Sequence, residues 1–276
     1  MHGPFDTFLS GPSYKALFTA SDTLVMGVDL GKLAVGDLLF VASPKGEARD
    51  LVSTTVTNAI TAAQRTTIPA DRFADSHVRH DRAHAMTHVG IYLGRGFVAD
   101  IYPGCLPRLL SLSSFASGTV DILALRHDDC AARVAAMSDT DRPNIERSWF
   151  EMAARVFARQ SEIKYASNQE VVEHVARTAL RGSLQDALAE QTAFHSWVCT
   201  NFAVQMLVGI LLERRFADDR RSMKRRVDNP EATDASLNLP SADHVLPAEL
   251  LTERYRAENG FGLVDIGLTR FDRSKR

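Results

Sequence analysis

Cysteine is scarce in this chain: three residues occur among 276, and they are Cys105, Cys130 and Cys199. An odd number of widely spaced cysteines does not predict a disulfide framework, which excludes the class of small secreted domains held together by several bridges. The pattern is typical of a protein that folds in a reducing compartment, or of one that keeps a free functional thiol.

Long hydrophobic segments are also absent from the sequence. Its first residues show no basic segment followed by an apolar one, so we expect no signal peptide and synthesis in the cytoplasm. The most apolar long stretch, residues 197–212, contains Thr200, Asn201 and Gln205. Because it is too short and too polar for a membrane span, we expect a buried helix there and no integral membrane segment.

A strong charge of either sign is absent as well, since 34 acidic and 32 basic residues leave a net charge of −2. That balance excludes a global electrostatic case for nucleic acid as a partner. Apolar residues make up 45% of the chain and charged residues 24%, values that exclude wholesale disorder. With no internal repeat and enough length to bury a core, the chain is expected to be globular.

What the sequence does contain is a set of short apolar segments between residues 36 and 126. They are rich in aliphatic and β-branched residues and are separated by turn residues, which is typical of strands. Gly94-Arg95-Gly96 joins two of them at hairpin distance. We therefore predict a small antiparallel sheet, with strands near 38–41, 87–93, 97–101 and 120–125.

Helical patterns surround and follow these segments. Residues 144–161 carry Trp149, Met152 and Val156 at helical spacing, and residues 48–65 are rich in alanine and threonine. A further helix is expected to start near Ser196 and to end near Leu212. Together with the strands, these helices predict the α+β class, with a small antiparallel sheet packed against helices.

Two polar stretches are predicted to be loops. Residues 66–85 are polar, and residues 214–240 begin with a basic run and continue into Asp-Asn-Pro and a Ser/Thr/Asn stretch. The basic run is expected to be a solvated loop, or a contact with anionic lipid head groups or cell-wall polymer. Its members are Arg214, Arg215, Arg220, Arg221, Lys224, Arg225 and Arg226.

Three residues form a candidate catalytic set: Cys199, His88 and Asp100. If Ser196 caps the helix, Cys199 lies in its first turn, where free amides and the helix dipole favour a thiolate and can bind an oxyanion. His88 lies on a predicted strand, and Asp100 lies on the next strand across the hairpin. A carboxylate there would orient the imidazole, as nucleophilic catalysis by cysteine requires.

The same residues resemble a known family. Gly36-Asp37-Leu38-Leu39-Phe40, His88-Val89-Gly90-Ile91-Tyr92-Leu93-Gly94, Val98-Ala99-Asp100 and Cys199-Thr200 are similar to the pattern of the circularly permuted NlpC/P60 group, which is papain-like and includes the poxvirus-type proteins. In that group the histidine strand precedes the cysteine helix. The segment 241–250 also resembles the one that follows the cysteine helix there.

By this resemblance, Cys199 matches the nucleophile and His88 the base, while Asp100 stands where the family usually has glutamate. The resemblance implies one permuted NlpC/P60 domain over residues 1–276, with insertions near 45–85, 127–190 and 214–240. It implies a cysteine hydrolase that cleaves an amide bond without cofactor or metal. The leading substrate is a cell-wall peptide, which makes the chain a peptidoglycan amidase or endopeptidase.

Other interpretations remain open. The substrate can instead be a lipid acyl chain, as in the related lecithin:retinol acyltransferase-like enzymes, or the chain can be an inactive binding module. Cys199 alone is compatible with an ordinary buried cysteine, because buried cysteine packs as a small hydrophobe. Asp100 alone is compatible with a surface acid near a turn, and Asp37 is expected to fix a turn.

Histidine positions offer one more alternative. Residues 77, 80, 84 and 88 are all histidine, a spacing that suits a metal site on one helix face, but the strand pattern around His88 argues against it. His195, four residues before Cys199, would touch it if the helix began early, but it is expected to be a surface residue before that helix.

Location follows from the substrate. Peptidoglycan lies outside the cytoplasmic membrane, and relatives in the superfamily include secreted antibacterial effectors. Two routes are therefore open: either the substrate is cytoplasmic, or a dedicated secretion machine delivers the folded protein into a target cell. The resemblance implies the second route, with an immunity protein as partner.

Overall fold

The computed structural model describes residues 27–28, 30–42, 51–73, 78–101, 106–116, 121–138, 140–160, 199–226, 239–241 and 246–268. Four residues that the sequence singles out lie outside these ranges: Cys105, His77, His195 and Ser196. So do residues 161–190 of the predicted 127–190 insertion and residues 227–238 of the predicted 214–240 insertion.

The described residues form an α+β structure built on an antiparallel sheet, as predicted. Its strands follow the order β5-β4-β3-β2-β6-β7, and every neighbouring pair is antiparallel. A separate two-stranded sheet pairs β1 with β8. The strands are β1 (Gly27–Val28), β2 (Leu38–Ala42), β3 (His88–Gly94), β4 (Phe97–Asp100), β5 (Arg108–Ser111), β6 (Asp121–His127), β7 (Phe261–Leu263) and β8 (Gly267–Leu268).

The β3–β4 hairpin turns through three consecutive residues with positive φ. Gly94, Arg95 and Gly96 have φ values of 102°, 54° and 79°, and glycine adopts such values without a Cβ penalty. The hydroxyl of Tyr92 accepts a hydrogen bond of 3.0 Å from the Gly96 amide. This tight turn fixes how β4 lies against β3, and so sets which side chains meet across the hairpin.

Strand β3 is apolar on both faces. Val89, Ile91 and Leu93 face the larger core, while Tyr92 belongs to a smaller core on the other face with Phe115. A strand buried on both sides is a rigid platform, because neither face can move without repacking.

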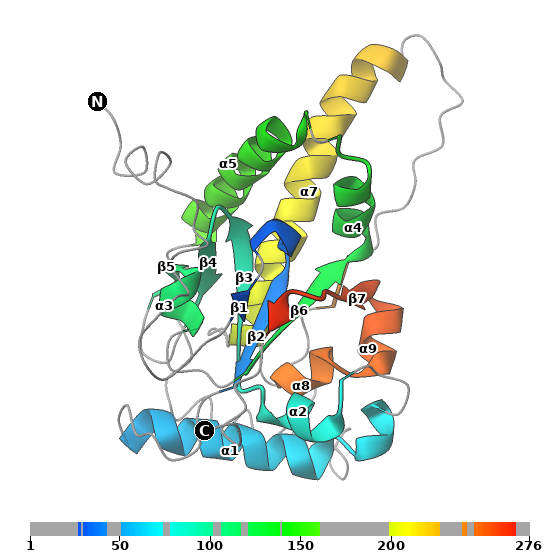
Figure 1. The fold of residues 1–276 in the computed structure, drawn as a ribbon. Coiled ribbons are helices and arrows are strands. Elements are labelled where there is room, and N and C mark those ends of the chain that lie inside the picture. Colours follow the sequence, from blue (N-terminus) through cyan, green and yellow to red (C-terminus); the bar gives the residue numbers. More distant parts are fainter. Residues whose placement is uncertain are drawn as a thin grey trace, which may run out of the picture.

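Long helices cover the larger-core face. In Figure 1, α5 and α7 run side by side along the sheet, and both pack against β3. Helix α1 lies at the end of the sheet where β3 begins, next to α2. The helices are α1 (Leu51–Thr67), η2 (Leu30–Lys32), η3 (Ala70–Phe73), α2 (His80–Ala85), α3 (Leu112–Ala116), α4 (Asp128–Ala135), α5 (Arg142–Gln160), α7 (Cys199–Arg226), α8 (Pro247–Leu250) and α9 (Glu253–Glu258).

A buried glutamine ties three elements together just before β3. The Gln64 side-chain amide donates to the carbonyls of His84 and Met86 at 2.9 and 3.0 Å, and its oxygen accepts from the Ala248 amide at 2.8 Å. Both N–H donors and the oxygen of one side chain are thereby used to join α1, the entry to β3 and α8. The start of β3 is therefore held in place from outside the sheet.

The prediction of a loop over residues 66–85 is wrong for most of that range. Helix α1 continues to Thr67, and η3 and α2 follow. The charged residues that suggested a loop alternate with apolar anchors: Phe73, Ala83 and Met86 are buried. These anchors give the short helices a core to pack on, which composition alone does not reveal.

The basic run was also predicted to be a loop, and this is wrong up to residue 226. The backbone of α7 remains helical to Arg226. Arginine and lysine are good helix formers, so a basic run can extend a helix that tertiary contacts have already started. In the part of the chain that the structure describes, no helix combines the length and apolarity that crossing a membrane requires.

Candidate active site

Cys199 is the first residue of α7. Its side chain is buried in the larger core, with 4% of the residue exposed, and the first turn of the helix contains no acidic residue. The positive end of the helix dipole lies at such a position. The thiol therefore lies where a negative charge is favoured.

His88 is the first residue of β3 and lies between a carboxylate and an aromatic ring. Its Nε2 is 2.9 Å from Oδ2 of Asp100, and its ring centroid is 5.8 Å from that of Phe115. Because Nε2 faces the carboxylate, Nδ1 is the ring nitrogen left for a partner on the opposite side. The imidazole is thus oriented by a hydrogen bond on one edge and by an aromatic contact on its face.

Cys199 and His88 meet where α7 packs against β3. The thiol is hydrogen-bonded to the imidazole, and it also receives hydrogen bonds from the Val89 amide and the Thr200 hydroxyl. Burial raises the pKa of Cys199, but attraction to His88 and these hydrogen bonds outweigh it, so the pKa is lowered. Four separate features, the helix terminus included, favour the thiolate.

The pKa of His88 shifts in the opposite direction to that of Cys199. Burial lowers the pKa of His88, but the charge of Cys199 and the hydrogen bonds to Asp100 and Cys199 raise it to about 10. A thiolate and an imidazolium each stabilise the other in a site with little access to water. Both shifts run in the direction that favours a thiolate–imidazolium pair.

Asp100 completes the chain of contacts and is itself held by Arg108. The carboxyl is 1% exposed, and burial raises its pKa. Hydrogen bonds and charge from His88, followed by those from Arg108, reverse this effect and lower the pKa. Asp100 is thus a buried carboxylate rather than the surface acid considered as an alternative.

Gly90 makes room for this arrangement. A Cβ built at that position would lie 2.8 Å from the Phe115 ring, 2.8 Å from Val98 and 3.0 Å from the Ala99 carbonyl. Nothing larger than hydrogen fits between β3 and α3. The glycine lets Phe115 approach the sheet closely enough to contact His88.

The second described cysteine differs sharply from the first. Cys130 is buried in α4, and burial together with the nearby Asp37 charge raises its pKa to about 12. No histidine is among the groups that act on it. Both cysteines are buried and free, so what separates them is the charge of their neighbours.

Asp37 performs the structural role expected of it. Its carboxylate accepts a hydrogen bond of 2.8 Å from the Ala34 amide. It also accepts hydrogen bonds from Nε and a terminal nitrogen of Arg126, at 2.8 and 2.7 Å. This pair links the turn before β2 to β6, at the opposite end of β2 from Val41, the residue that pairs with His88.

The three described histidines of the histidine-rich segment do not form the arrangement that suggested a metal. His80 and His84 lie on α2, where the His84 Nε2 is 3.0 Å from the Ile68 carbonyl, whereas His88 is on β3 and bonded to Asp100. Over the described ranges, no group of three or more histidine, cysteine or acidic residues has the geometry to hold a metal ion.

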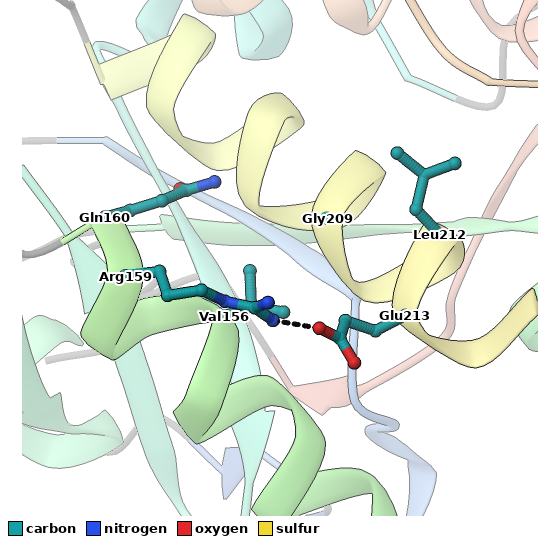
Figure 2. Close-up of a pocket in the computed structure, with 6 residues that line it drawn as sticks. All are labelled: Val156, Arg159, Gln160, Gly209, Leu212 and Glu213. Carbon is teal, nitrogen blue, oxygen red and sulfur yellow. Dashed lines mark hydrogen bonds and ion pairs between the residues drawn. The ribbon is translucent and has the colours of Figure 1, made fainter. Parts of the chain in front are cut away.

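A separate groove lies between α5 and α7. Val156, Gly209 and Leu212 line it, and Figure 2 shows Arg159 and Glu213 pointing toward one another across it in an ion pair. Gly209 is ten residues after Cys199, or about 15 Å along the helix. The groove is therefore distinct from the cysteine site.

The structure brings together all three residues of the predicted set and adds one that sequence reasoning missed, Arg108. It is the direct cross-strand partner of Asp100 in β5. The four-residue strand β5 is too short for a clear alternating pattern, but a basic residue at hairpin distance after Asp100 was a usable signal.

Comparison with protein-family models, with curated proteins and with solved structures gives no match to this chain, so the geometry of the site carries the functional argument.

Proposed function

We propose that the chain is a cysteine hydrolase of the permuted NlpC/P60, papain-like kind, with Cys199 as nucleophile, His88 as general acid and base, and Asp100 as the residue that orients His88. The observation that carries this proposal is the continuous series of contacts from the Cys199 thiol through His88 to Asp100, with the thiol at a helix N-terminus. Structural cysteines do not need an oriented imidazolium beside them.

The first half of the reaction transfers an acyl group to sulfur. The Cys199 thiolate attacks the substrate carbonyl carbon, a C–S bond forms, and the carbonyl electrons move onto oxygen. Amides in the first turn of α7 are suited to stabilise that oxyanion. The oxyanion then collapses, the bond to the leaving group breaks, and the His88 imidazolium gives its proton to the departing nitrogen or oxygen.

Water completes the cycle. His88, now neutral, takes a proton from a water molecule that attacks the thioester carbon. The C–S bond breaks, the thiolate returns, and the acid product leaves. Throughout, the Asp100 carboxylate keeps Nε2 occupied, which leaves Nδ1 to face the reacting atoms. His88 carries each proton that moves: it gives one to the leaving group and takes the next from water.

Peptide amide bonds of the bacterial cell wall are the substrate class we propose, on the strength of the sequence resemblance. The test is incubation of the full chain with purified peptidoglycan, followed by mass spectrometry of the released fragments and of the protein. We expect new amines and carboxylates in the fragments and a transient acyl adduct on Cys199. A matched incubation with Cys199→Ala controls for contaminating hydrolases.

Two other outcomes would redirect the proposal. Acyl adducts on Cys199 from phospholipid vesicles but not from peptidoglycan would replace the substrate class while keeping the nucleophile. Absence of an adduct with peptide, lipid and generic thioester substrates alike would favour an inactive binding module.

A further inference from the structure

Arg108 contacts Asp100 from β5, the strand on the other side of β4 from β3. Its Nε donates to Oδ1 at 3.0 Å and its terminal nitrogen donates to Oδ2 at 2.6 Å, the same oxygen that lies 2.9 Å from His88 Nε2. The two residues are paired across β4 and β5, so the contact is built into the sheet register. A two-point contact of this kind fixes both the position and the rotation of a carboxylate.

We propose that Arg108 is a positioning residue of the active site: it locks the Asp100 carboxylate in the orientation that receives His88, and thereby maintains the imidazolium that activates Cys199. The inference rests on the proposed function and extends it to a fourth residue. Arg108 acts through Asp100 and does not itself contact the reacting atoms.

The physical reason lies in the burial of Asp100. With 1% of the residue exposed, burial favours the neutral acid, and two cationic groups oppose this, His88 and Arg108. Without Arg108, the carboxyl keeps one of the two and is free to rotate about χ2. Both changes make the charged form of His88 less stable. Because the imidazolium stabilises the Cys199 thiolate, the thiolate becomes less stable as well.

Loss of Arg108 is expected to reach Cys199 through Asp100 and His88. The titratable groups that face the pair come from three strands and one helix: His88 from β3, Asp100 from β4, Arg108 from β5 and Cys199 from α7. Loss of Asp100 orientation disfavours the thiolate through His88, whose charge lowers the pKa of Cys199. The pKa of Cys199 is therefore expected to rise.

The experiment measures the rate of alkylation of Cys199 by iodoacetamide as a function of pH, read by peptide mass spectrometry on the full chain. We expect Arg108→Gln to move the apparent pKa of Cys199 upward by about one pH unit. Arg108→Lys keeps the charge but loses the two-point contact. In this variant the apparent pKa of Cys199 should lie between that of the unaltered chain and that of Arg108→Gln.

Arg126→Gln is the matched control. Arg126 makes an equivalent two-point contact with the buried Asp37, at the opposite end of β2 from the strand position that pairs with His88. Both variants remove a guanidinium from a buried carboxylate, so a purely structural role for Arg108 predicts lower thermal stability in both and no change in the alkylation profile of either. Equal profiles in Arg108→Gln and Arg126→Gln would overturn the inference.

A double variant tests the route through Asp100. In an Asp100→Asn background, Arg108→Gln should cause no additional shift, because the group through which it acts is gone. A full additional shift would overturn the positioning role. Should Arg108→Gln fail to fold, Arg108→Lys against Arg126→Lys gives the same comparison. Failure of Cys199 to react in the unaltered chain would instead contradict the proposed function.

Discussion

His88 Nε2 lies 2.9 Å from Oδ2 of Asp100, a residue twelve positions further along the chain and on the neighbouring strand. The β3–β4 hairpin brings the two together, and α7 brings Cys199 to the other side of the ring from 111 residues away in sequence. Rigid elements therefore set the positions of all three groups. Such preorganisation is what nucleophilic catalysis needs, because misplacement by about 1 Å costs about 10²-fold in rate.

Removal of either reacting group should abolish turnover. Cys199→Ala removes the nucleophile and His88→Ala removes the proton carrier, and each is expected to lower kcat by about 10⁴-fold or more. The double variant should be no slower than either single variant, because the two groups act as one unit. The measurement is steady-state hydrolysis of a cell-wall peptide substrate, with thermal melting of each variant.

Cys130→Ala supplies the control for this series, since Cys130 is also buried but has a raised pKa. It is expected to keep full kcat. Asp100→Ala should retain measurable activity, about 10²-fold below the unaltered chain, because the imidazole remains next to the thiol. Full turnover in Cys199→Ala would show that the nucleophile is elsewhere.

The pH dependence of kcat/KM should be bell-shaped. Activity needs the Cys199 thiolate and the His88 imidazolium together. As pH falls, the thiolate is protonated, and since the pKa of Cys199 is lowered, this limb should lie well below the usual range of a cysteine. As pH rises, the imidazolium loses its proton near the raised pKa of about 10.

One form of the pH profile would contradict the coupling between Cys199 and His88. A single rise centred on the usual range of a free cysteine, with no alkaline decline, would mean that the thiol titrates independently of His88. Measurement in buffers of constant ionic strength avoids a separate effect of salt on the charged pair.

Gly90→Ala should disturb both stability and the site. The added methyl would lie 2.8 Å from the Phe115 ring, so Phe115 or β3 has to shift. We expect a loss of about 1–3 kcal/mol in the free energy of unfolding, as for other overpacked cores, and reduced kcat because Phe115 contacts His88. Gly262→Ala in β7 is the control, because a Cβ there meets no atom within 4 Å. Equal melting temperatures for the two variants would contradict this account of Gly90.

Much of this site follows from local sequence patterns. The strand around His88, the Gly94–Gly96 turn and the strand containing Asp100 are all short-range features, so a hairpin with these two residues across it was predictable. Cys199 at the start of an apolar helix was predictable for the same reason. The packing of the first turn of this helix against His88 depends on long-range contacts. It was suggested by the family resemblance and not by the spacing of residues in the sequence.

The errors have a common cause. Residues 66–85 and 214–226 contain many charged residues, and composition alone suggested solvated loops. Helix formation there depends on anchors such as Phe73 and Met86, and on extension of an existing helix through Arg214, whose guanidinium donates to the Asp129 carbonyl at 3.0 Å. Tertiary contacts overrode the local signal in both places. Arg108 was missed because its role exists only across a strand pair.

Export should determine toxicity if the substrate is peptidoglycan. Expressed in bacteria with an added export signal, the chain is expected to reduce growth, and the same chain kept in the cytoplasm is expected to have little effect. The physical reason is that the cell wall lies outside the cytoplasmic membrane. Growth curves of both strains measure the difference, and the exported Cys199→Ala variant should be harmless.

The controls of this experiment separate the alternatives. Equal harm from the exported and the cytoplasmic forms would indicate a cytoplasmic or lipid target instead of the cell wall. Harm that persists in Cys199→Ala would contradict an enzymatic cause.

The most direct test of the central claim compares two buried cysteines in one molecule. The full chain is treated with iodoacetamide at pH 7, and alkylation of Cys199 and Cys130 is followed over time by peptide mass spectrometry. We predict that Cys199 reacts far faster, because its pKa is lowered by His88 whereas that of Cys130 is raised to about 12. His88→Ala should remove most of the difference. Alkylation of Cys199 as slow as that of Cys130 in the unaltered, folded chain would contradict the assignment of Cys199 as an activated nucleophile.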